Sequence, residues 1–231
     1  MKRILAYVLL IGITLVVVIG CSQATPEPTP TPTPADYLNM ASTAMADVQT
    51  AQFSLAREGT PLVLDPTLGA QFLSATGQFQ APDQVHASVK ADISGNILNV
   101  DLLWLPEGNF MTNPLTGAYM PLEAALPLNP TEMFDPDVGL SHILITSVND
   151  PAVVGIETIE GVETHHLTGT AEAEEVAVLA PTGLIGAFGI DLWLDTETLR
   201  VVRVRLTEQS GDSTVLDFFG YDESVDIPSP S

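Results

Sequence analysis

The chain of 231 residues has one cysteine, Cys21, and only seven lysines and arginines against 29 aspartates and glutamates. A single cysteine excludes an intramolecular disulfide framework and a metal cluster held by cysteines. The shortage of basic residues excludes nucleic acid as a partner and disfavours anionic headgroups, because both need lysine or arginine for neutralisation. The acidic residues are scattered, which is typical of a solubilising surface. The fold must therefore depend on an apolar core, for which 45% hydrophobic residues are sufficient.

The N-terminus has the layout of a secretory signal peptide, predicted over residues 1–20. Lys2 and Arg3 precede an apolar run at 4–19, which as a helix would reach about 24 Å, short of the roughly 30 Å hydrocarbon core. The alternative is a single membrane-spanning anchor. The final four residues, VIGC, resemble the lipobox of bacterial lipoproteins, which implies cleavage before Cys21 and acylation of its sulfur. We therefore expect an extracytoplasmic protein anchored to the cell membrane through Cys21, with a mature net charge of 5 − 29 = −24.

A linker is predicted over residues 21–35, because 25–34 reads TPEPTPTPTP. Such a segment buries no apolar surface and favours extended polyproline II, about 3.1 Å per residue or roughly 30 Å in all. Residues 36–231 are expected to form one domain.

Hydrophobic periodicity then predicts a helix at 37–49, capped by Asp36, with an apolar stripe that includes Leu38, Ala41 and Met45. Period-two alternation predicts strands around Phe53 and Phe79. The further strands are expected at 84–93, 97–105, 108–112, 164–170, 188–195, 199–208 and 213–221, with helices at 137–147 and 173–180. The order of helix, strand meander, helical middle and second meander indicates an α+β fold with an antiparallel sheet.

Seven stretches in one order resemble the LppX/LprAFG envelope lipoproteins, which have the LolA/LolB-like fold. They are VQTAQFSLAREG, ATGQFQAPDQV, NFMTNPLTGAYMPL, FDPDVGLSHIL, GIETIEGVETHHLTG, IDLWLDTETLRVVRVRL and LDFFGYDESVDIPSP. The resemblance implies a strongly curved antiparallel half-barrel with helices packed on its concave side and a lipid held in the cavity between. Departures from the family pattern at Tyr119 and at 219–222 leave the identity of the lipid open.

The cavity is expected to be lined by apolar residues of the inner sheet face and of the helical middle. These residues are Phe53, Leu55, Phe79, Val89, Leu102, Trp104, Leu126, Leu128, Met133, Phe134, Leu144, Leu192, Leu194 and Val204. Within them, the stretch 122–139 is rich in proline and leucine and is predicted to form the cavity mouth or a lid. The alternatives are a closed core without a cavity and, for 122–139, a surface loop held by its own prolines.

Signatures of enzymes are weak. His165 and His166 are neighbours on a predicted strand, so their side chains should point to opposite faces and not share a metal. Neither a G-x-S-x-G elbow around Ser141 or Ser147 nor a phosphate-binding glycine loop occurs. We expect no catalytic residues, metal or cofactor. The predicted function is a membrane-anchored lipoprotein that binds a neutral or weakly charged lipid and carries or transfers it within the envelope. The alternatives are an envelope sensor or interaction module that binds a protein partner without lipid and, more remotely, an envelope enzyme.

Overall fold

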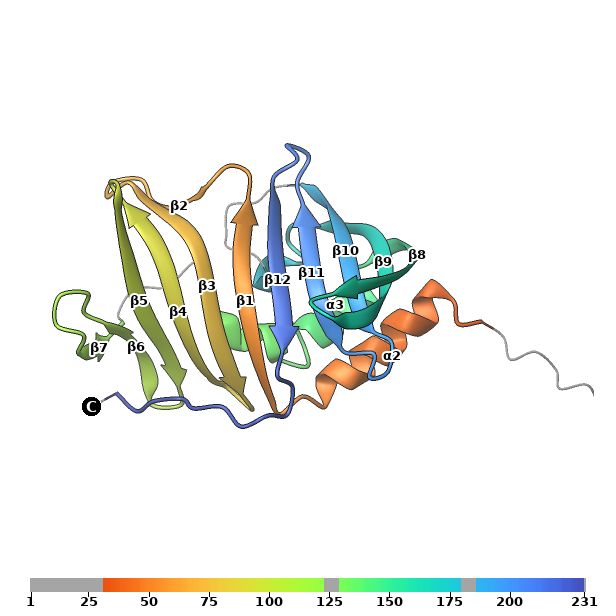
Figure 1. The fold of residues 1–231 in the computed structure, drawn as a ribbon, viewed down its shortest axis with the longest axis horizontal. Helices are drawn as coiled ribbons and strands as arrows, with labels where there is room; N and C mark the ends of the chain where they lie inside the picture. Colours follow the sequence, from red (N-terminus) through yellow and green to blue (C-terminus); the bar gives the residue numbers. More distant parts are fainter. Residues whose placement is uncertain (1–30, 123–128, 180–185, 231) are drawn as a thin grey trace, which may run out of the picture. The chain divides into compact units, whose positions relative to one another are not determined.

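Figure 1 shows the fold in the computed structural model, which describes residues 31–122, 129–179 and 186–230. The contacts assign Pro32–Ser231 to one compact unit. Cys21, Leu126 and Leu128 lie outside the described residues.

Helix α2, Pro34–Ala46, begins three residues earlier than predicted. Its cap is Thr33, whose hydroxyl accepts the Asp36 backbone N–H at 3.2 Å. The Asp36 carboxylate in turn accepts the Thr33 hydroxyl at 2.6 Å and the Thr33 N–H at 2.8 Å, and these two hydrogen bonds lower the pKa of Asp36. The prediction of Asp36 as the cap was therefore wrong, because Asp36 is the third helical residue of a capping box. Pro34 fits the first turn, where its missing N–H leaves no partner unpaired.

Twelve antiparallel strands form one open, curved sheet with the order β7-β6-β5-β4-β3-β1-β12-β11-β10-β9-β8, and β2 pairs with β3 outside this path. The strands are β1 Thr50–Glu58, β2 Leu62–Asp65, β3 Ala70–Gln80, β4 Gln84–Ile93, β5 Asn96–Leu105, β6 Gly108–Thr112, β7 Tyr119–Pro121, β8 Asn149–Ile159, β9 Val162–Glu172, β10 Ala187–Asp195, β11 Val201–Thr207 and β12 Ser213–Phe219. The first meander runs outward from β1 to β7, and the second returns from β8 to β12. The first and last strands therefore meet in the middle of the sheet (Figure 1).

The predicted α+β order and the predicted strands are confirmed, but three strands were missed. β2 and β7 are short, and β8 is an edge strand in which no residue is buried. An edge strand without a buried face shows no period-two alternation, and Pro151 and Gly155 in β8 read as breakers.

The helical middle is shorter than predicted. It consists of the 3₁₀ turn η1, Pro130–Phe134, and helix α3, Leu140–Thr146. The predicted helix at 173–180 was wrong: among its described residues only Ala177–Leu179 form a 3₁₀ turn, η2.

One face of the sheet, called here the inner face, packs against α2 and α3. Leu38, Ala41 and Met45 of α2 and Leu140 and Leu144 of α3 belong to the same buried cluster as the inner side chains of the strands. No described helix is long and apolar enough to cross a bilayer.

The C-terminal segment runs past the ends of β1 and β3 (Figure 1). The partly buried Tyr221 donates its hydroxyl to the Val201 carbonyl at 2.6 Å, and desolvation of this side chain raises the pKa of the phenol. Further along, the Asp226 N–H donates to Oε1 of Gln78 at 2.9 Å. The segment is thereby fixed to both halves of the sheet.

Candidate functional site

A row of directly paired residues crosses the inner face from the centre of the sheet to its β7 edge. The pairs run Phe218, Phe53, Gly77, Ala87, Leu102, Met111 and Met120. Exposure rises along the row, from 2% at Phe218 through 9% at Leu102 to 43% at Met120. The inner face is thus closed where α2 and α3 cover it, and its apolar side chains become accessible towards β7.

Small residues on the inner face of β3 and β4 leave room for larger side chains from neighbouring strands. Ala75, Gly77 and Ala87 lie next to one another in the register, and the Phe53 ring occupies the space above Gly77. A Cβ atom at Gly77 would lie 2.3 Å from Cζ of Phe53. The glycine therefore lets the Phe53 ring pack directly against the backbone of β3.

Three phenylalanines connect the helical middle to the sheet. Phe134, at the end of η1, stacks on Phe79 with centroids 4.1 Å apart and contacts Phe218 edge-on at 5.8 Å. Its neighbour Met133 is only 1% exposed. Met133 and Phe134 of η1 therefore pack into the core, and the alternative of a surface loop is wrong for η1, whereas residues 136–138 of the same predicted stretch are exposed.

The described cavity candidates all belong to the apolar cluster of the inner face. Phe53, Leu55, Phe79, Leu102, Trp104, Met133, Leu144, Leu192, Leu194 and Val204 are buried, whereas Val89 and Phe134 are partly buried against them. The described candidates therefore share one apolar cluster, and their contact with a lipid stays a prediction. The accessible end of the row, with the partly buried Met111 and the exposed Met120, was missed, although β6 and β7 each carry one methionine that could have indicated it.

Charge is kept away from this apolar surface. Four of the five basic residues in the described ranges are paired with carboxylates: Arg57 with Glu208, Arg200 with Asp222, Arg203 with Asp217 and Arg205 with Glu58. The fifth, Lys90, is exposed, and its place in β4 alternates with the inner residues Val89 and Ala91. The described residues therefore provide no unpaired cation on the inner face.

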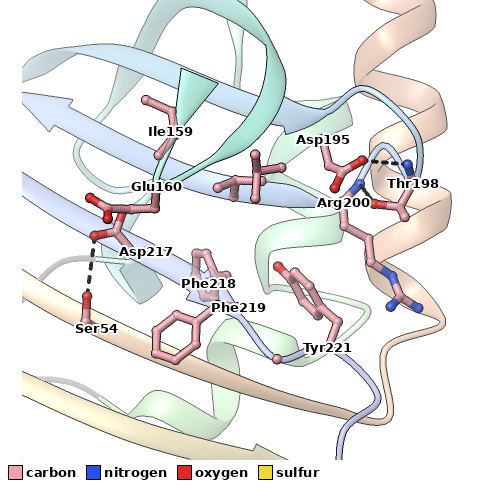
Figure 2. Close-up of a pocket in the computed structure, with 13 residues that line it drawn as sticks. Ser54, Ile159, Glu160, Asp195, Thr198, Arg200, Asp217, Phe218, Phe219 and Tyr221 are labelled. Atoms are coloured by element: carbon pink, nitrogen blue, oxygen red, sulfur yellow. Dashed lines mark hydrogen bonds between the residues drawn. The ribbon is translucent and has the colours of Figure 1, made fainter. Parts of the chain in front are cut away.

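The opposite face, called here the outer face, carries a groove of about 560 Å³ shown in Figure 2. It lies over β1, β11 and β12, and the turn between β8 and β9 forms one wall. Two of its carboxylates have internal partners: Asp217 accepts from Ser54 and Arg203, and Asp195 accepts the backbone N–H groups of 197 and 198. The remaining lining is mainly apolar and includes Phe219, which is 48% exposed.

Sequence reasoning missed this groove. The signal that could have indicated it is Phe219 itself, a large apolar residue at an outer position of β12 that alternation would assign to a polar side chain.

The adjacent histidines point to opposite faces, as predicted. The His165 ring lies 4.5 Å from that of Tyr37 in α2. The His166 nitrogens lie 2.9 Å from Glu157 and 2.9 Å from Asp191, and its ring stacks on Trp193. Hydrogen bonds from Trp193 and His166 lower the pKa of Glu157. Within the described residues, no three histidine, aspartate or glutamate side chains are arranged to hold a metal ion.

Comparison with known proteins gives a family match and two close folds. The model of the LppX_LprAFG lipoproteins matches residues 33–227. The crystal structure of LprF from Mycobacterium bovis aligns with a TM-score of 0.71 at 18% identity, over 88% of this chain and 99% of that protein. LppX from Mycobacterium tuberculosis aligns with a TM-score of 0.61 at 17% identity, over 84% and 98%. No curated protein sequence matches the chain. The resemblance predicted from the seven sequence stretches is confirmed.

Proposed function

Because the chain belongs to the LppX_LprAFG lipoprotein family, we propose that it binds a lipid on the inner face of its sheet and carries or transfers it within the cell envelope. The observation that supports this proposal is the row from Phe218 to Met120, along which the apolar inner face passes from closed to accessible. An acyl chain laid along such a surface gains about 0.8 kcal/mol for each buried CH₂, without any specific hydrogen bond.

In this proposal the inner face is the concave side of the curved sheet, and α2, α3 and η1 fill the part that the ligand leaves. The ligand enters from the side of β6 and β7, where Met111 and Met120 offer flexible, adaptable contacts. Leu126 and Leu128 follow β7 in the chain and belong, with Met133 and Phe134, to the proposed mouth.

The proposed ligand is neutral or weakly charged. An anionic headgroup needs a cation, but the described arginines are each paired with a carboxylate and Lys90 lies away from the inner face. Bringing an unpaired anion to this surface would cost desolvation energy that no described residue returns.

Membrane attachment is assigned to acylated Cys21. The net charge of −24 expected for residues 21–231 (5 − 29) repels an anionic bilayer, so the lipid anchor supplies the attraction, and a linker of roughly 30 Å keeps the domain within reach of the membrane. The anchor thereby places the proposed mouth near the source of its ligand.

The test is native mass spectrometry, with organic extraction, of the chain from residue 21 with Cys21→Ser, purified without detergent. We expect a lipid at about one per protein, mainly uncharged. Met120→Asp should lower its occupancy, because a carboxylate would enter the accessible end of the apolar row. Leu115→Asp is the matched control, since Leu115 is 92% exposed in the turn before β7.

Two results would contradict the proposal in different ways. A folded protein that contains no lipid would refute lipid binding and favour the interaction module. A charged lipid as the main ligand would refute the inference of a neutral cargo while leaving the inner-face site intact.

A further inference from the structure

Phe219 is the exposed aromatic ring of the outer face. It ends β12, is 48% exposed, and lies directly opposite Gln52 of β1. The ring borders the groove of Figure 2 on one side and a smaller hollow of about 150 Å³ on the other. It therefore stands between two depressions in the same surface.

The smaller hollow is lined by side chains that form hydrogen bonds but carry no carboxylate, ammonium or guanidinium group. Besides Phe219 and the backbone positions Phe53 and Gly77, they are Gln52, Thr76, Gln78, His86 and Ser88. The register brings them together, because Gln52 pairs with Gln78, Gln78 with His86, and Thr76 with Ser88. These five polar residues and Phe219 are called here the Phe219 strip.

Several groups of the Phe219 strip lack internal partners. Nε2 of His86 is buried and has no hydrogen-bond partner among the described residues. No hydrogen bond within the described chain uses the side chains of Thr76 or Ser88, whereas Gln78 accepts only the N–H of Asp226 through its oxygen. That nitrogen is closed to solvent, so a ligand in the hollow meets instead the accessible side chains of Gln52, Thr76 and Gln78.

The absence of carboxylate, ammonium and guanidinium groups from the Phe219 strip limits the charge that a ligand can carry. In a chain with 29 acidic residues, the hollow contains none. A phosphate or carboxylate ligand would find no cation there, and an ammonium group would find no carboxylate. A ligand that fits has an apolar face for the Phe219 ring and several neutral hydroxyls for the side-chain amides and hydroxyls of the hollow.

We propose that the Phe219 strip binds a neutral saccharide, with one face of a pyranose ring lying on Phe219 and its hydroxyls hydrogen-bonded to Gln52, Thr76 and Gln78. This site lies on the outer face and is independent of the lipid site proposed for the inner face. A soluble or wall-attached glycan and the sugar headgroup of a membrane lipid offer the same chemistry, and the experiment separates these two sources.

The first arm is a titration of the ¹⁵N-labelled chain from residue 21, carrying Cys21→Ser, with cellotetraose and with α-1,6-mannotetraose, followed by ¹H–¹⁵N spectra. We expect saturable shifts around Phe219 and Gln52 for at least one sugar, with a Kd on the order of 1 mM. Phe219→Ala should weaken binding by about tenfold or more, and Phe219→Trp should restore it. Leu115→Ala, far along the chain in an exposed turn, should leave it unchanged.

The second arm is co-sedimentation with phosphatidylcholine vesicles that contain or lack digalactosyl diacylglycerol. Binding that needs the galactolipid and is lost in Phe219→Ala, without shifts for the free sugars, assigns the site to a lipid headgroup. Shifts for the free sugars assign it to a glycan.

Three results would overturn the proposal. They are the absence of both responses, sugar shifts that Phe219→Ala leaves unchanged, and equal binding to vesicles without galactolipid, which would identify an apolar docking surface. Because Phe219→Ala alone could disturb β12, Thr76→Val provides a second variant: it removes one hydroxyl at nearly constant volume and should weaken the sugar shifts while the unfolding midpoint stays constant.

Discussion

Replacing Phe134 by alanine tests whether η1 is fastened to the sheet by aromatic packing. The side chain is partly buried, so the lost transfer free energy is about half of the 1.5–3 kcal/mol for a fully buried phenylalanine, or about 1 kcal/mol. The stacked contact with Phe79 and the edge contact with Phe218 add about 0.5–1.5 kcal/mol each. Phe134→Ala should therefore lower the free energy of unfolding by about 2–4 kcal/mol.

The assay is urea unfolding of the delipidated protein, because a ligand bound only to the native state would add its own stabilisation. Leu115→Ala, at a side chain 92% exposed, should stay within about 0.5 kcal/mol of the wild type and serves as the control. A loss below about 0.5 kcal/mol for Phe134→Ala would refute the reasoning, since the three rings would then not act as a packing unit. An unchanged urea dependence of the unfolding free energy is needed for this comparison.

Two further predictions concern the sheet. The hydrogen bond from Trp193 lowers the pKa of Glu157 in the folded state, so the ionised side chain stabilises the fold above the ordinary glutamate pKa, and this stabilisation is lost as pH falls through the folded value. Glu157→Gln should therefore flatten the acid side of a plot of urea midpoint against pH. An identical slope in both proteins would contradict this prediction. Gly77→Ala should destabilise by about 1–3 kcal/mol, because the new Cβ meets the Phe53 ring, whereas Gly155→Ala meets no atom within 4 Å and should change the urea midpoint little; equal losses would contradict the packing argument.

The strands that were predicted correctly have one buried face and one more solvent-accessible face. In β4, Val85 and Ala87 are buried while His86 is only half-buried, and this alternation is visible in the sequence. The edge strand β8 has no buried face and gives no such signal. Periodicity therefore identified the elements that contribute to the core and missed those that only extend the sheet.

The capping of α2 shows a second limit. Both Thr33 and Asp36 are suitable cap residues, and both lie near the end of the Thr-Pro segment. The choice between them depends on a reciprocal pair of hydrogen bonds that forms only when Pro34 occupies the first turn. The sequence indicates that a helix begins in this region, but only the geometry of the capping box shows that Thr33 is the cap residue.

The sequence by itself determined the α+β class, the family, the apolar composition of the inner face and the shortage of cations, because periodicity, motif order and counting depend only on local residues. The tertiary structure decided which parts of that face are closed, since the register from Phe218 to Met120 joins strands far apart in the chain. It also decided that Phe219 lies beside Gln52, with a hollow on one side and a groove on the other. Such neighbours arise only from strand pairing over more than 160 residues, and no local pattern encodes that pairing.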